Sequence, residues 1–179
     1  MLEIPADTRI RMILAENYPF GSAITENDDE GYRQPEISTG WWDNQTSRPQ
    51  ITVTNPSEGV LDGGSTGYTS GTGTGGVGRI WTGYALVNAW VKDDDIRLRA
   101  TQSTIDAGRA SGKQVSYMLA KNAAEVITDY ANGYLHPETG RVVFRSMGVD
   151  DVERRATPDQ DELYRYEFSA LFNHADTTG

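Results

Sequence analysis

Two glycine-rich motifs in the middle of the sequence have the spacing of known functional loops. Residues 71–76 (GTGTGG) satisfy G-x-G-x-x-G, in which glycines let backbone N–H groups at a helix start approach a pyrophosphate. Residues 63–67 (GGSTG) satisfy G-x-S-x-G, which exposes a nucleophilic serine, here Ser65, on a tight turn from strand to helix. Both lie in a tract, 59–78, in which nine of twenty residues are glycine. Because this tract leads into an expected strand, we attribute both matches to composition and predict no nucleotide site and no catalytic serine.

The chain has two histidines, and neither stands where a triad needs it. His136 precedes Pro137 in an expected turn, and His174 lies near the C-terminal end of the sequence. We predict surface or strand-end roles for both and no catalytic residue. The absence of cysteine excludes thiolate catalysis, zinc sites built on cysteine, and disulfides.

Acidic residues cluster at 27–30, 93–95 and 150–151. Carboxylate oxygens in such clusters can coordinate Ca²⁺ or Mg²⁺, but none of the three has the spacing of a calcium-binding loop. We predict solvated charge, with a loosely held cation at 93–95 as the open alternative. No cofactor and no resident metal are expected.

The charge balance argues against a broad basic binding surface. The formal net charge is −10, and only three of the 16 basic residues are lysines. An acidic surface of this kind disfavours adhesion to DNA or anionic membranes. It suits a halophilic host, because molar salt screens its self-repulsion, although an ordinary acidic protein is the alternative.

The hydropathy pattern indicates neither a membrane span nor a signal peptide. No window of about 18 apolar residues exists, and the N-terminal residues lack the basic and then apolar order of a leader. We expect the protein in the cytoplasm, or in a particle assembled there.

The first half of the chain alternates short elements with long polar segments. Residues 5–17 have helical apolar spacing, with Asp7 as the expected cap and Tyr18-Pro19 as the stop. Residues 21–48 form a polar arm or loop, in which Trp41-Trp42 packs onto the core or, if exposed, marks an interface. A strand over 50–55 is expected to end at Pro56, before a Gly/Ser/Thr-rich loop over 56–79.

The second half supplies the expected core, residues 80–174. Residues 79–92 are apolar on both faces and predict a central strand covered on both sides, and 96–100 can return as a short strand. Residues 111–132 predict a long helix, opened by the capping pair Ser111 and Gln114. Strands are expected at 141–147 and 163–173, the latter with one buried and one wet face. The expected buried stripe of the helix is Val115, Met118, Leu119, Val126 and Tyr130.

These elements predict an α+β fold in a single domain, 1–179. Only one long helix lies between strands, which favours a mainly antiparallel sheet of about four strands, packed by that helix and the short N-terminal one.

The order of several weak motifs resembles the tail terminator (tail completion) proteins of tailed phages and archaeal tailed viruses. The similarity covers most of the chain outside 21–48 and 56–79, two insertions without a counterpart. The motifs are D-x-x-I-R-x-x-L at 7–14, P-x-I-x-V at 49–53, a long strand at 84–91, a helix at 111–132, G-V-x-D-x at 148–152 and a Tyr-Arg strand at 164–168.

The resemblance implies a structural virion protein and no enzyme. Family members form a ring, usually a hexamer, on the last tail-tube ring, end tail polymerisation, and meet the head or neck. The implied partners are other copies, the tail tube protein and a neck protein, with DNA passing through an acidic lumen without specific binding. A head-tail connector and, less favoured, a small hydrolase are the alternatives. The candidate subunit-interface residues are Arg97, Arg99, Arg145, Arg154, Arg155, Trp41 and Trp42.

Overall fold

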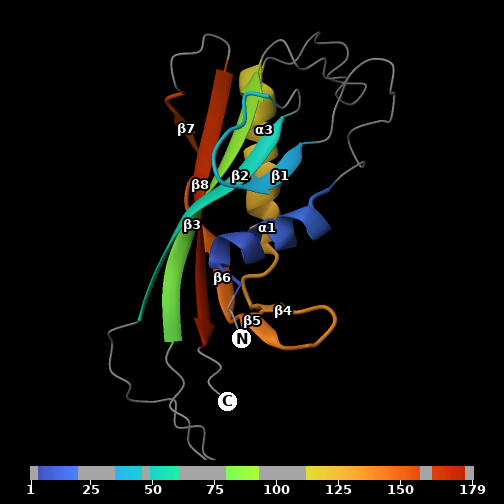
Figure 1. Ribbon diagram of the computed structural model, residues 1–179, viewed down its shortest axis with the longest axis vertical. Coiled ribbons are helices and arrows are strands. Elements are labelled where there is room, and N and C mark those ends of the chain that lie inside the picture. Colours follow the sequence, from blue (N-terminus) through green and yellow to red (C-terminus); the bar gives the residue numbers. More distant parts are fainter. Residues whose placement is uncertain are drawn as a thin grey trace, which may run out of the picture.

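A twisted sheet with two helices on one side forms the body of the molecule (Figure 1). The computed structural model describes residues 4–19, 35–45, 49–60, 80–92, 112–157 and 163–175. The helices are α1 (Ala6–Asn17) and α3 (Gly112–Thr128). The strands are β1 (Glu36–Thr39), β2 (Gln50–Val60), β3 (Ile80–Lys92), β4 (Tyr134–Leu135), β5 (Val142–Phe144), β6 (Ser146–Val149), β7 (Glu153–Arg155) and β8 (Leu163–Ala175).

The main sheet has the strand order β1-β2-β3-β8-β6, and β7 also pairs with β8. Only the β1–β2 pair is parallel in this sheet, and β4 and β5 form a separate antiparallel hairpin. The chain therefore has an α+β fold with a mostly antiparallel sheet, as the sequence predicts. The described residues contribute six strands to that sheet, and not about four, because short edge strands were not anticipated.

One face of the main sheet, here called the helix face, holds the hydrophobic core. In the middle of the sheet Val87 of β3 lies between Val53 of β2 and Phe168 of β8, and all three side chains are buried. Both helices cover this face, α3 along the strands and α1 across them (Figure 1). Burial of such a set of aliphatic and aromatic side chains is the main stabilising contribution in a domain of this size.

Helix α1 follows the predicted range but not the predicted cap. Its buried positions Ile10, Ile13 and Leu14 face the core. Pro5 occupies the N-cap, and Asp7 is the second residue of the helix, where its carboxylate accepts a hydrogen bond from the Thr8 amide at 2.6 Å. The prediction of Asp7 as the cap is wrong, because the helix begins one residue before it. Tyr18 is extended, as expected of a residue before proline, and ends the helix.

Helix α3 packs more closely on the sheet than its sequence indicates. Met118, expected in the buried stripe, is 38% exposed, whereas Ser116 is fully buried and donates a hydrogen bond to the Ala89 carbonyl at 2.8 Å. Small residues of α3 at the contact (Ala120, Ala123 and Ala124) let the helix backbone approach the strands. After α3 the chain reverses through Gly133, whose φ of 109° favours glycine.

Strand β2 continues beyond the proline that was expected to end it. The register with β3 shifts between Thr54 and Ser57, so that Pro56 falls in a β-bulge. A bulge removes the need for the proline N–H in the ladder, and the strand resumes as far as Val60.

Three further boundaries differ from the predictions. Residues 36–39, assigned to the polar arm, form β1, and 153–155, assigned to an acidic linker, form β7. The strand expected over 141–147 is divided at Arg145 into β5 and β6. In β8 the face expected to be wet contains Glu167, which is 6% exposed.

Several predictions concern residues outside the described ranges. These are the motifs at 63–67 and 71–76, the acidic clusters at 27–30 and 93–95, the strand at 96–100, Arg97, Arg99 and the cap Ser111.

Candidate functional site

The face of the main sheet opposite the helices, here called the open face, carries the features that most resemble a binding surface. Tyr84 of β3 and Leu171 of β8 are cross-strand partners on it, with exposed fractions of 43% and 45%. Leu86 next to them is half-buried. The prediction that both faces of β3 are covered is therefore wrong along this part of the strand, because neither α1 nor α3, the helices in the described ranges, packs there and these side chains meet solvent.

The other end of the open face is covered by the tryptophan pair that follows β1. The Trp41 ring meets the buried Trp90 ring edge-on, with centroids 4.9 Å apart, and Trp42 stacks on Trp90 at 6.3 Å. Trp90 donates a hydrogen bond from its indole nitrogen to the Thr52 hydroxyl at 2.9 Å. The pair thus packs on the core, as one of the two predictions had it, while Trp41 remains 48% exposed.

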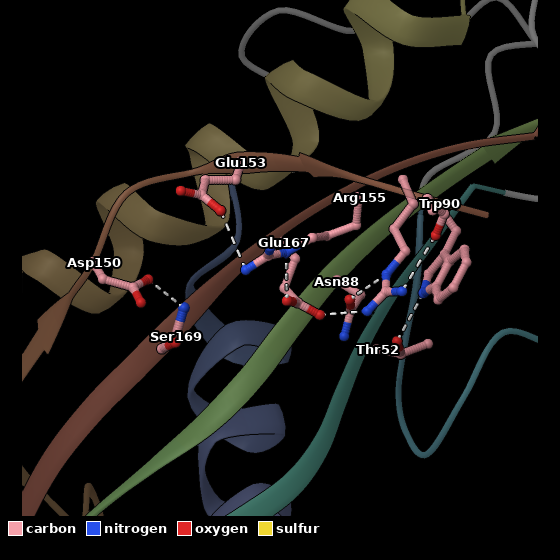
Figure 2. A network of polar contacts seen from close by, with 10 residues as sticks. Thr52, Asn88, Trp90, Asp150, Glu153, Arg155, Glu167 and Ser169 are labelled. Carbon is pink, nitrogen blue, oxygen red and sulfur yellow. Dashed lines mark hydrogen bonds and ion pairs between the residues drawn. The ribbon is translucent and has the colours of Figure 1, made fainter.

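A polar network lies beside these rings (Figure 2). The Arg165 guanidinium lies 4.5 Å from the Trp41 ring centroid and 4.9 Å from that of Trp90. Its Nε donates to Asn88 Oδ1 at 2.8 Å, and its Nη2 pairs with Glu167. Cation–π attraction and charged hydrogen bonds therefore converge on one side chain.

The same carboxylate also binds a second arginine. Arg155 of β7 contacts Glu167 at 3.0 Å and Glu153 at 3.2 Å. Two carboxylates and two guanidinium groups make this network electrically neutral, which limits the cost of burying Glu167. It ties β3, β7 and β8 together, and we interpret it as a structural element rather than a catalytic one.

A small hollow beside the network is lined mostly by charged and polar side chains. Its volume is about 170 Å³. The lining residues are Asp150, Asp151, Glu153, Arg155, Glu167, Phe168 and Ser169. No histidine lines it, and Asp150 is engaged, because its carboxylate accepts a hydrogen bond from the Ser169 amide.

The two histidines lie in different places. His174 of β8 contacts Glu58 of β2 at 3.2 Å and stacks on Trp81. His136 begins the turn of the β4–β5 hairpin, where its Nδ1 accepts hydrogen bonds from the amides of Glu138 and Thr139. The imidazole–carboxylate contact of His174 is a feature that a hydrolase could use, and the sequence alone did not indicate that Glu58 is the partner.

The candidate interface residues within the described ranges occupy distinct environments. Arg145 is exposed between β5 and β6, and its backbone amide donates to the Asn173 carbonyl at 2.7 Å. Arg154 is exposed on β7, 5.9 Å from the Tyr164 ring. Arg155 is already paired within its own chain, as described above. Sequence reasoning did not select Arg165, Glu167 or Asn88, because their link is made only by the register of β3 against β8.

The described residues contain no group of three or more His, Cys, Asp or Glu side chains that could hold a metal ion. Neither α1 nor α3, the helices in the described ranges, is long and apolar enough to cross a membrane.

No family model matches the chain, and a search of curated proteins finds no match.

Proposed function

We propose that this chain is a structural virion protein that forms a ring at the head-proximal end of a viral tail tube. In this role it ends tail polymerisation and joins the tail to the head or neck. DNA passes through its lumen without specific binding, as the net charge of −10 favours.

The observation that carries the proposal is where the motifs of the resemblance lie. The segments 7–14, 49–53, 84–91 and 164–168 fall in or at the start of α1, β2, β3 and β8, which share one core, and 148–152 begins within β6 at the edge of the same sheet. Each sequence motif is weak evidence when taken alone, but these motifs lie together in one packed domain, as the motifs of a common family would.

The exposed surfaces agree with a protein that works by contact. The open face presents Tyr84 and Leu171, and the polar network at its other end is neutral and internally paired. Apolar side chains that gather on an uncovered sheet face are typical of protein interaction sites.

The test is gold-labelled antibody imaging of intact, sheared and tailless virus particles from a producing culture. We expect label at the head-tail junction of intact particles and on one end of isolated tails. Label that stays with the heads after shearing would favour the head-tail connector instead. Absence of label from every particle, with the protein abundant in the lysate, would overturn the virion proposal.

The contact between His174 and Glu58 keeps a small hydrolase as the second candidate. Such an enzyme would need Ser65 as its nucleophile, with the imidazole as base. Purified protein is assayed with short-chain esters beside the variants Ser65→Ala and His174→Ala. Loss of a measurable activity in both variants would support the hydrolase, and full retention in Ser65→Ala eliminates it.

A further inference from the structure

Thr54 of β2 and Asn88 of β3 are polar residues buried within the main sheet, with exposed fractions of 6% and 0%. The Thr54 hydroxyl oxygen and the Asn88 amide nitrogen have no hydrogen-bond partner in the described part of the chain. Burial of a polar atom without a partner costs the free energy of its lost hydration, so most such atoms in native proteins bond to protein or to an ordered water. These two atoms therefore indicate a small ligand inside the fold.

The register of β2 against β3 places the two side chains on the same face of the sheet. Asn88 is the cross-strand partner of Thr52, which precedes Thr54 by two residues. Thr54 and Asn88 are therefore diagonal neighbours on the open face. The orientation of the Asn88 amide is also determined, because its oxygen accepts from Arg165, which can only donate (Figure 2). The amide nitrogen is thus the atom that remains to be paired.

We propose that one buried water molecule binds between the Thr54 hydroxyl and the Asn88 amide nitrogen. An amide nitrogen only donates, whereas water and a hydroxyl both donate and accept, so a water can accept from Asn88 and pair with Thr54. Diagonal positions of adjacent strands lie roughly 7–8 Å apart, and the two side chains shorten this gap to a span that one water bridges. The water continues the hydrogen-bond chain from Arg165 of β8 through Asn88 of β3 to β2. This inference does not depend on the proposed ring.

The charge of the surroundings favours water over a chloride ion. Both atoms can donate, as an anion site requires, but the Arg165 guanidinium next to Asn88 is already paired with Glu167. A buried anion without a compensating charge is costly, whereas a neutral water with hydrogen-bond partners is not. The ligand should therefore be present whether or not the solution contains chloride.

A high-resolution crystal structure of the full chain tests the site directly, with crystals grown in bromide in place of chloride. We expect an electron-density peak within hydrogen-bond distance of both atoms and no anomalous bromide signal at this position. An anomalous signal would identify a halide and overturn the water. The absence of a peak, or direct hydrogen bonds from both atoms to protein groups, would overturn it as well.

Urea unfolding gives an independent test, in which the sign of the effect decides. Thr54→Val replaces the hydroxyl by a methyl group of similar size. If the hydroxyl binds water, the variant should lower the urea midpoint by about 0.5 M, because the water loses a partner.

The matched control is the same substitution at Thr52, on the same face of β2. Thr52→Val leaves the Trp90 indole nitrogen without its acceptor and should also lower the midpoint. A midpoint of Thr54→Val at or above that of wild type would overturn the proposal, since removal of a hydroxyl that is buried without a partner does not destabilise.

Discussion

Removal of the Arg165 guanidinium tests whether the polar network holds the open face together. Arg165→Met keeps the length of the side chain but leaves Glu167 with Arg155 alone and leaves the Asn88 carbonyl without its donor. Trp41 also loses the cation beneath its ring. We expect a less stable protein with a more mobile tryptophan turn.

The magnitude follows from the burial of the pair. The side chains of Arg165 and Glu167 are 13% and 7% exposed, and breaking a buried ion pair costs about 3–5 kcal/mol. Because Arg155 still contacts Glu167, we expect the lower end, about 3 kcal/mol in the free energy of unfolding. The double variant Arg165→Met/Glu167→Leu removes both buried charges and should recover most of this loss.

The assay is urea unfolding followed by tryptophan fluorescence and circular dichroism. Arg154→Met is the matched control, since this arginine is exposed on β7, and its effect should lie within about 0.5 kcal/mol of zero. The reasoning is refuted if Arg165→Met costs less than about 1 kcal/mol, or if the double variant is no more stable than the single one.

Two further predictions follow from packing and ionisation. Gly83→Ala should destabilise by about 1–3 kcal/mol, because a Cβ there would overlap the Ser57 carbonyl of β2. Gly59→Ala, where nothing lies within 4 Å, should be nearly neutral in the same urea unfolding assay, and equal effects would refute the overlap. Burial, followed by the negative charge of Glu16, raises the pKa of the Tyr134 hydroxyl to about 12, above its ordinary value of 10.0. The stabilisation from the neutral Tyr134 hydroxyl is fully present below pH 10.0 and is lost as the pH rises through about 12. The difference in unfolding free energy between wild type and Tyr134→Phe should therefore shrink between these two pH values. A difference that does not depend on pH would contradict this.

The long elements were predictable because their patterns are strong. The helical apolar spacing of α3 and the two-residue alternation of β8 each run over more than ten residues, which is enough to identify the element type. The burial of individual side chains was not predictable, however. Met118 was expected to be buried and is exposed, whereas the polar Ser116 is buried, because the packing of α3 on the sheet sets the rotation of the helix about its axis. The fold class could therefore be read from the sequence, but the contact positions could not.

Short strands and the polar network depend on partners distant in the chain. Strand β1 has four residues and β7 has three, too few for a periodicity, and each exists because a longer neighbour pairs with it. Glu167 reads as a wet position in its own strand, yet the register places it beside Asn88, next to the Trp90–Arg165 pair. Only the assembled sheet brings these residues together.

The position of β8 has a consequence for how the protein is made. This strand pairs with β3 on one side and with β6 and β7 on the other, yet it is the last of the described strands in chain order. While the chain emerges from the ribosome, β3 therefore has an unpaired apolar edge until residue 175 is available. Late, non-local pairing of this kind slows folding and leaves a nascent chain open to aggregation for longer.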